Sequence, residues 1–206
     1  TTNTKMAEAK TLSFCGFTSP RVPAVKYKVV LTKGKDTYEH IIETKYDETA
    51  ITTLAERKKQ EEMTQIMFNM VEDLAYMVYE ITTMQKKAQE IIDADGKGKK
   101  EAQKLYDALE DFRTDLVVTT GDNYVASAEP ELRERMGDLY ANIAGSNDRV
   151  SGAQMQNYEL IKEEFEEEKE RFEAIKSKEG KKFMKVLEKN DMQLTIKSKE
   201  EFLSDD

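Results

Sequence analysis

Cysteine, histidine and proline are scarce in this sequence, with one Cys, one His and three Pro among 206 residues. A single cysteine, Cys15, excludes a disulfide within the chain, and we expect it to serve as a small apolar side chain. The one histidine, His40, has no cysteine partner for a zinc site and no aligned nucleophile for catalysis, so we expect it to face solvent on a strand. The scarcity of proline, together with abundant Glu and Lys, favours long helices over a β-barrel.

Positive charge and long apolar runs are also in short supply. The chain has 32 Lys and Arg against 41 Asp and Glu, a formal net charge of −9 at pH 7. This balance argues against general binding to nucleic acid, whose phosphates need a basic surface, and against docking on anionic lipid. No apolar run approaches the roughly 18 residues of a membrane span. We therefore expect no nucleic-acid partner and no membrane span.

The N-terminal part holds the signal of a β-hairpin. Two β-prone runs, residues 27–31 and 38–42, flank a turn in which Gly34 supplies a positive φ. Two strands alone are marginally stable in water, so we predict that the hairpin gains at least a third strand. The candidates are residues 1–20, which otherwise have the composition of a loop, and residues 192–196, whose apolar side chains alternate as in an edge strand.

From Thr53 onward the apolar residues follow a helical period. They recur at alternating spacings of three and four residues, the pattern of a helix that faces a core. The members of this stripe are Met63, Met67, Met70, Leu74, Met77, Ile81, Met84, Ala88 and Ile91. The stripe predicts a helix over residues 53–93, about 60 Å long at ~1.5 Å per residue. We expect this stripe, Met70, Leu74, Met77 and Ile81 included, to be buried against the second and fourth helices. The alternative left open is that residues 63–70 extend beyond the shorter helices and are available to a partner, because methionine surfaces adapt to varied partners.

Three more helices follow, again with apolar side chains three and four residues apart. The pattern predicts them over residues 102–116, 130–145 and 151–178, with a short helical piece after Gly180. Pro130 suits the first position of its helix. Short connections imply antiparallel neighbours, and we predict three layers: the first helix, the second, and a layer made of the third and fourth.

These patterns together predict an α+β chain that is mostly α, a long antiparallel helical bundle with a small N-terminal antiparallel β element. The predicted parts are a hairpin or partial β-sandwich remnant over residues 1–50 and the bundle over residues 51–190. Residues 191–206 form a C-terminal tail that contains the edge strand. The length suits one helical domain with a small appendage and is too short for two full-sized domains.

Several short motifs occur in an order that resembles a known family. The segment Val22-Pro23-Ala24 precedes the Tyr-x-Val strand pair, and Tyr46-Asp47 precedes the long helix. Further on, Glu131-Leu132-Arg133 lies in the third predicted helix, and Ser146-Asn147-Asp148 precedes the last long helix. From about residue 16 to residue 187, the chain is similar to the C-terminal region of secreted bacterial BNR-repeat, sortilin-like propeller proteins.

The resemblance implies an architecture and a location. In that family a β-propeller is followed by the end of an immunoglobulin-like β-sandwich and then by a helical bundle. It implies an extracytoplasmic accessory domain, whether periplasmic, cell-surface or secreted, and it assigns any enzymatic activity to the propeller. The chain departs from the family pattern at Val25, where a glycine is usual, and at Glu48, where a proline commonly follows the Asp.

Two acidic clusters invite a metal-binding interpretation but lack the necessary ligands. Residues 93–101 contain no third acidic ligand of a calcium loop, Gly96 falls two places too early, and nearby lysines repel the ion. The glutamates of residues 163–168 lack the histidines of a di-iron bundle. We therefore expect a helix connector in the first case and a solvated helix face with i, i+4 ion pairs in the second, and no metal or cofactor.

The composition and the motifs favour a non-catalytic protein-interaction module over an enzyme. We expect its binding surface to combine the loop 119–128 with the turn 146–152, since loops on a rigid bundle often carry recognition residues. The residues predicted to bind are Asn123, Tyr124, Asn147 and Arg149. The expected partner is a protein or the propeller of the parent chain. Two alternatives stay open: a hydrolase fragment that caps an active site on a propeller outside this chain, and a free-standing coiled-coil scaffold that forms a homodimer through its first helix.

Overall fold

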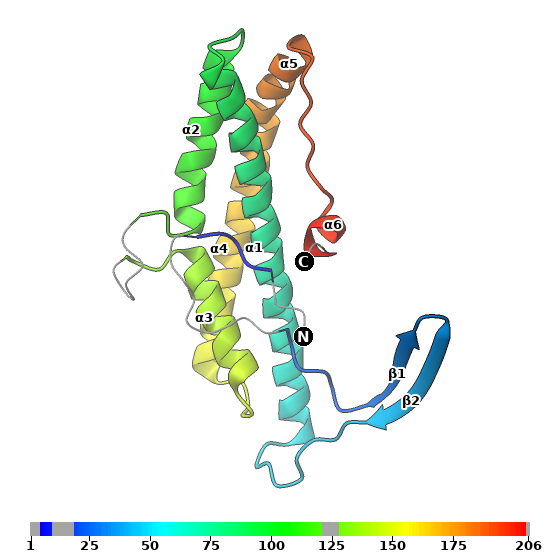
Figure 1. Ribbon diagram of the computed structural model, residues 1–206. Coiled ribbons are helices and arrows are strands. Elements are labelled where there is room, and N and C mark those ends of the chain that lie inside the picture. The colour runs from blue at the N-terminus through cyan, green and yellow to red at the C-terminus, as the bar shows by residue number, and fades with distance from the viewer. Residues whose placement is uncertain (1–4, 10–18, 121–127, 205–206) are drawn as a thin grey trace.

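The fold was analysed in a computed structural model that describes residues 5–9, 19–120 and 128–204. Two strands and a series of helices make up this part of the chain, which confirms the prediction of an α+β fold that is mostly α (Figure 1). The elements are β1 (Lys26–Lys33), β2 (Asp36–Glu43), α1 (Leu54–Asp93), α2 (Lys99–Leu116), α3 (Leu132–Gly145), α4 (Gly152–Ile175), a π-helical turn η1 (Lys176–Gly180), α5 (Lys181–Lys189) and α6 (Lys199–Ser204).

The long helix α1 begins and ends where the sequence predicts. Thr53 is its N-cap and forms a reciprocal capping box with Glu56, which satisfies two backbone N–H groups that the first turn leaves free. Its apolar stripe is buried along its whole length, with Met67 and Ile81 fully buried. The predicted burial of Met70, Leu74, Met77 and Ile81 is thus confirmed. The alternative of an available surface at residues 63–70 was wrong, because α3 packs against this part of α1.

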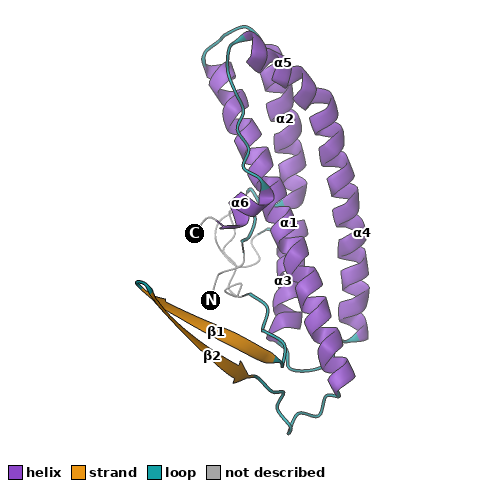
Figure 2. Ribbon diagram, turned by 90° about the vertical axis from the view of Figure 1, so that its right-hand side faces the viewer, coloured by secondary structure: helices purple, strands orange, loops and turns teal. Residues whose placement is uncertain are grey.

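The helices form three layers, but not the three that the sequence predicts. Figure 1 shows α2 and α3 stacked end to end along α1, so these two helices make one broken layer. The third layer is α4, η1 and α5, which together run the full length of the bundle (Figures 1 and 2). The predicted pairing of the third and fourth helices in one layer was wrong, because α2 and α3 are each too short to cover α1 alone.

A π-helical turn joins α4 to α5 without a break. The sequence predicts an end near residue 178, yet Lys181 N–H donates to the carbonyl of Lys176 and the helix continues. The buried stripe of α4 includes Phe165 and Phe172, and it resumes after the turn at Phe183. A π turn widens a helix locally without ending it, so α4 and α5 form one continuous layer of the bundle.

The third helix begins two residues later than predicted. Its first residue is Leu132 and its N-cap is Glu131, whereas Pro130 lies outside the helix. Glu131 has an extended backbone with φ −84° and ψ −176° and makes no side-chain cap. Leu132 itself is fully buried, so the helix starts where the first core side chain is needed.

The hairpin follows the prediction in its strands and its turn, and departs from it in its neighbours. β1 and β2 pair antiparallel from Lys26–Glu43 to Lys33–Asp36, and Gly34 has φ +65°. Within the described residues the sheet has two strands only. Residues 193–198 are not a strand but a coil, so the predicted edge strand of the tail was wrong. Residues 5–9 and 19–20 add no strand either, and the rest of residues 1–20, Cys15 included, lies outside the description.

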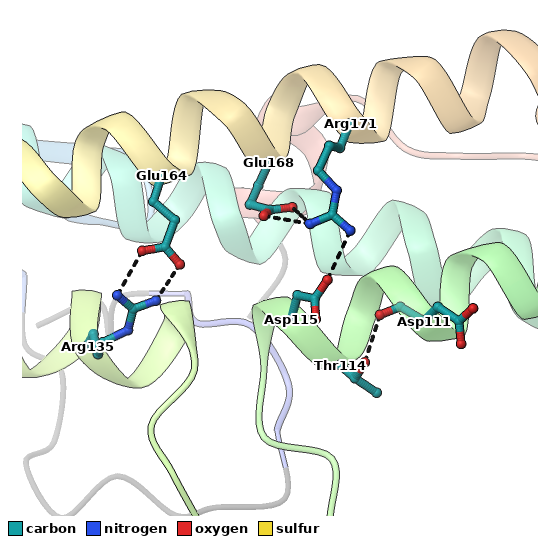
Figure 3. A network of polar contacts seen from close by, with 7 residues as sticks. All are labelled: Asp111, Thr114, Asp115, Arg135, Glu164, Glu168 and Arg171. Atoms are coloured by element: carbon teal, nitrogen blue, oxygen red, sulfur yellow. Dashed lines mark hydrogen bonds and ion pairs between the residues drawn. The ribbon is translucent and has the colours of Figure 1, made fainter.

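Ion pairs tie the break between α2 and α3 to the middle of α4 (Figure 3). Arg135 of α3 holds Glu164 with both terminal nitrogens, and Arg171 of α4 joins Glu168 at 2.7 Å to Asp115 at 3.0 Å. Burial raises the pKa of Glu168, and the hydrogen bonds from Arg171 oppose that rise. The acidic run of α4 is therefore not the uniformly solvated face that we predicted, and its pairs within the helix are at i, i+3.

One half-buried carboxyl in α1, that of Glu80, makes the stability of the bundle depend on pH. Burial raises the pKa of Glu80, and Lys176, 3.8 Å away, only partly opposes the rise. A carboxyl with a raised pKa stabilises the folded chain fully below its unfolded pKa of about 4.3, and this contribution is lost as the pH rises through its folded pKa. We therefore expect Glu80→Gln to raise the melting temperature at pH 7 and to leave it nearly unchanged at pH 4.

Thermal melts of the two proteins between pH 4 and pH 8 measure this effect. Glu62→Gln is the matched control, since Glu62 lies on the exposed side of the same helix. The explanation fails if Glu80→Gln and Glu62→Gln shift the melting temperature equally at every pH.

Candidate interaction site

The structure separates the two halves of the predicted binding surface. Asn123 and Tyr124 lie outside the described residues, whereas Asn147 and Arg149 lie in the turn after α3. The described flanks of the 121–127 loop adjoin the N-terminal end of α3, and the turn follows its C-terminal end (Figure 1). Fourteen helical residues separate these ends, about 21 Å at ~1.5 Å per residue. The described flanks and the turn are thus not the neighbours that we expected.

A pocket at the foot of the bundle does include Asn147. Its volume is about 250 Å³, and it lies where the two stems of the hairpin meet the first turns of α1 and the end of α3. The lining residues come from four separate stretches of the chain: Pro20, Arg21, Val22, Lys45, Tyr46, Asp47, Ala50, Arg57, Gln60, Glu61, Thr64, Ala144 and Asn147. Arg21 donates a hydrogen bond to the side-chain oxygen of Asn147 and so links the hairpin stem to the turn.

The inner wall of the pocket is a buried polar contact between α1 and α3. The amide nitrogen of Gln60 donates to the carbonyl of Ile143 at 2.7 Å and to that of Ser146 at 3.1 Å. These carbonyls belong to the last turn of α3, whose C=O groups have no partner within the helix. Gln60 therefore closes the end of α3 and fixes the position of the turn that carries Asn147 and Arg149.

The outer wall of the pocket is polar and partly charged. The hydroxyl of Tyr46 donates to Glu61 at 2.9 Å, and the pKa of Tyr46 is raised by burial first and by this hydrogen bond second. Asp47 accepts hydrogen bonds from the side chain and the backbone N–H of Thr49, which lower its pKa. Both carboxyls thus already have partners within the chain, and the pocket holds its own stem residues in place.

Arg149 lies beside this pocket rather than in it. Its side chain is 73% exposed and its guanidinium is 3.8 Å from Glu56, the residue that caps α1. Hydrogen bonds from Thr53 lower the pKa of Glu56, so this carboxyl is charged near neutral pH. Arg149 is therefore an accessible cation at the foot, whereas Asn147 is bound within the chain by Arg21.

The hairpin next to the pocket has two unlike faces. Paired residues of a sheet share a face and successive residues alternate, so the register assigns every side chain. One face carries mostly apolar side chains: Tyr27, Val29, Leu31, Tyr38, His40 and Ile42. The opposite face is mixed, with an ion pair between Lys28 and Glu39 at 2.7 Å.

The apolar face of the hairpin is not covered by the described part of the chain. Leu31 is 63% exposed, Tyr38 58% and Val29 44%. Figure 2 shows why: the hairpin stands away from the bundle, and no helix lies over either of its faces. His40 is exposed on this same face, as predicted. Sequence reasoning found the strands but not this face, although the alternation of residues 27, 29 and 31 carries the signal.

The foot of the bundle offers hydrogen-bond donors, acceptors and an apolar sheet face, a combination suited to binding. Among residues 5–9, 19–120 and 128–204, no three His, Cys, Asp or Glu side chains gather as metal ligands. No helix in this described part combines the length and apolar character needed to cross a bilayer. Comparison of the chain with known protein families, with curated proteins and with solved structures gave no match.

Proposed function

We propose that this chain is a non-catalytic interaction module, a rigid helical bundle that presents a β-hairpin to a β-rich protein partner. The observation that carries the proposal is the uncovered apolar face of the hairpin. Soluble proteins seldom leave adjacent large apolar side chains exposed unless a partner covers them. The face is a single surface, because Leu31 and Tyr38 are direct partners in the register and Val29 is the next residue on the same side.

The chemistry of the hairpin favours a sheet as its partner. A two-stranded hairpin is marginally stable by itself, and it becomes stable when further strands or a second sheet cover it. The outer edges of β1 and β2 have no neighbouring strand in the described chain, so their backbone N–H and C=O groups can pair with added strands. Packing against a second sheet at about 10 Å, as in a β-sandwich, buries the apolar face.

This arrangement agrees with the resemblance to the C-terminal region of exported sortilin-like propeller proteins. There the hairpin corresponds to the end of the immunoglobulin-like sandwich, and the partner is the remaining β-structure of the parent chain. We propose an extracytoplasmic location on that ground alone. In this proposal any catalytic activity belongs to the partner and the bundle supports the hairpin, whose stems are held at the foot by Tyr46 and Arg21.

The burial of the apolar stripe of α1 disfavours the coiled-coil alternative. A homodimer through α1 needs the apolar stripe on its surface, but Met67, Leu74 and Ile81 are at most 2% exposed inside the chain's own bundle. The stripe is therefore not accessible to a second copy, and any self-association must involve another surface.

The proposal is tested by expressing this chain together with the polypeptide encoded directly upstream of it. We expect the two to co-purify, and Leu31→Asp to weaken their association at least tenfold, because it places a charge in an apolar contact. Thr32→Asp is the matched control, because Thr32 is the next residue along the strand and faces the opposite side. Hydrogen exchange of residues 29–31, fast in the chain alone, is expected to slow in the complex.

Three results count against the proposal. They are an upstream polypeptide without β-rich sequence, equal losses from Leu31→Asp and Thr32→Asp, and unchanged exchange of the hairpin in the mixture. Turnover of a glycoside or peptide substrate by the purified chain contradicts its non-catalytic part. Both substitutions lie on exposed side chains, so the melting temperature of the bundle reports that each variant is folded.

A further inference from the structure

The C-terminal tail leaves the bundle at a fixed point. The side-chain amide of Asn190 donates to the carbonyls of Val186 at 2.7 Å and Lys97 at 3.1 Å, which ties the end of α5 to the α1–α2 connection. Asp191 follows with φ +52°, a left-handed conformation that turns the chain back toward α1. The N–H of Met192 then donates to the carbonyl of Leu187 at 3.0 Å. These contacts fix the point at which the tail leaves the bundle. Its described residues after that point, 192–204, are called the arm.

The arm runs down the bundle as an extended segment and ends in one short helix. Residues 193–198 have no regular secondary structure, and three side chains of the arm pack partly buried against the core: Met192, Leu194 and Ile196. Figure 1 shows this segment running alongside α1 from the end of α5 to α6, which lies beside the middle of α1. The extended part of the arm therefore contacts the bundle through every second side chain, and α6 contacts α1.

The end of the arm is bound by two tyrosines of α1. The ring of Phe202 stacks on Tyr79 with centroids 4.8 Å apart and lies 5.8 Å from Tyr76. The two tyrosine rings are themselves 6.0 Å apart, so they form a platform on one side of α1. Offset and tilted aromatic pairs at these distances attract one another beyond the burial of their surface.

The tyrosine platform also recognises the backbone of the arm. The hydroxyl of Tyr76 donates to the carbonyl of Lys197 at 2.9 Å, and the hydroxyl of Tyr79 accepts from the N–H of the same residue at 3.2 Å. One turn before Tyr76, Asp73 forms an ion pair with Lys199. Together these groups bind a peptide segment through the backbone N–H and C=O of one residue, one cation and one aromatic ring.

We infer that this α1 surface, formed by Asp73, Tyr76 and Tyr79, is an exchangeable peptide site. The chain's own arm fills it in cis, and the arm of a second copy fills it when the cis arm is displaced. No residue of α6 is buried, so exchange of α6 removes no buried side chain from the core. A second copy is the occupant that fits, because its arm supplies the same backbone N–H and C=O of Lys197, the same Lys199 and the same Phe202.

The inference does not rest on the proposed function of the hairpin. The tyrosine platform lies in the middle of α1, whereas the hairpin joins the foot of the bundle (Figure 1). An arm-exchanged dimer leaves the apolar face of the hairpin free in each copy.

The experiment uses the full chain and a fluorescent peptide with the sequence of residues 192–206. Phe202→Ala in the full chain removes the aromatic contact of the cis arm and vacates the site. Apparent affinity falls in proportion to the fraction of sites that are vacant. We therefore expect the Phe202→Ala chain to bind the peptide at least tenfold more tightly than the unaltered chain.

Two controls separate this site from other surfaces. Tyr79→Ala added to the Phe202→Ala chain is expected to abolish binding, whereas Tyr38→Ala, an exposed tyrosine of the hairpin, is expected to leave it unchanged. Sedimentation of the unaltered chain at concentrations above the dissociation constant of the peptide is expected to show dimers that Phe202→Ala lacks. Equal or absent peptide binding by the two chains overturns the exchangeable site, and a monomer at every concentration overturns the second copy as its occupant.

Discussion

Replacing Leu74 by Ala is expected to lower the free energy of unfolding by about 2–5 kcal/mol. Leu74 is 2% exposed at the centre of the α1 stripe, where the layers of the bundle meet. Truncation to Ala loses the favourable free energy of transferring the removed methyl groups out of water. It also leaves a cavity that the closely packed neighbouring helices cannot fully close. Denaturant unfolding followed by circular dichroism measures the loss.

The matched control is Leu160→Ala on α4. Leu160 is 66% exposed, so its truncation is expected to change the free energy of unfolding by less than about 0.5 kcal/mol. The two variants delete the same atoms from helix interiors, and their difference isolates burial. A loss below about 0.5 kcal/mol for Leu74→Ala contradicts the packing of α1 described here.

Gly98→Ala is expected to destabilise the chain by about 2–5 kcal/mol, the sum of backbone strain and overpacking. Gly98 precedes α2 with φ +94°, a conformation that residues with a Cβ rarely adopt. A Cβ built there lies 2.2 Å from Cγ1 and 2.8 Å from Cγ2 of Val186, far inside contact distance. The connection between α1 and α2 or the position of α5 must shift to accept it.

A double-mutant cycle separates the two causes. In a Val186→Ala background the steric clash is removed and the strained φ remains, so Gly98→Ala is expected to cost less there than in the unaltered chain. Gly96→Ala, two residues away, is the control, because no atom lies within 4 Å of its added Cβ and its φ is not positive. Equal melting temperatures for Gly96→Ala and Gly98→Ala disprove the close approach of α5 to this glycine.

Leu74→Ala and Gly98→Ala also bear on the proposed function, because both destabilise the bundle that holds the hairpin. A hairpin can present a face to a partner only if its base is held still, and here the base is the foot of a bundle whose packing runs the length of α1. Tyr46 and Arg21 connect the hairpin stems to that foot, and Gln60 joins α1 to the end of α3 within it. Loss of bundle packing is therefore expected to weaken the partner's binding without any change in the hairpin itself.

The candidate site could be predicted from the sequence only in part. The turn after α3 was found, with Asn147 and Arg149, because its Ser-Asn-Asp composition marks a turn. The pocket residues Tyr46 and Arg21 were missed, since they approach Asn147 only through the path of the hairpin stems. Gln60 had a usable signal: it is a polar residue three positions before Met63, in line with the apolar stripe, and such a residue must find a buried partner.

The sequence by itself determined the local elements of this protein. The capping boxes of Thr53 and Ser151 define the starts of α1 and α4, and Gly34 defines the hairpin turn, because these signals act through hydrogen bonds and φ values within a few residues. The apolar stripes likewise determined which side of each helix is buried. All of these features depend on residues that are close together in the sequence, so the sequence encodes them whichever helices pack together.

Only the tertiary structure decided which surfaces meet. A stripe gives the buried side of a helix but not the helix that covers it, so the stacking of α2 on α3 and the burial of Met67 by α3 depended on helix lengths and junctions. The same holds for the π turn at residues 176–180, through which α4 continues into α5 beyond the predicted end near residue 178. The tail has alternating apolar residues like a strand, yet it lies as a coil on α1, because the hairpin stands away from it and Tyr76 and Tyr79 hydrogen-bond the backbone of Lys197 instead.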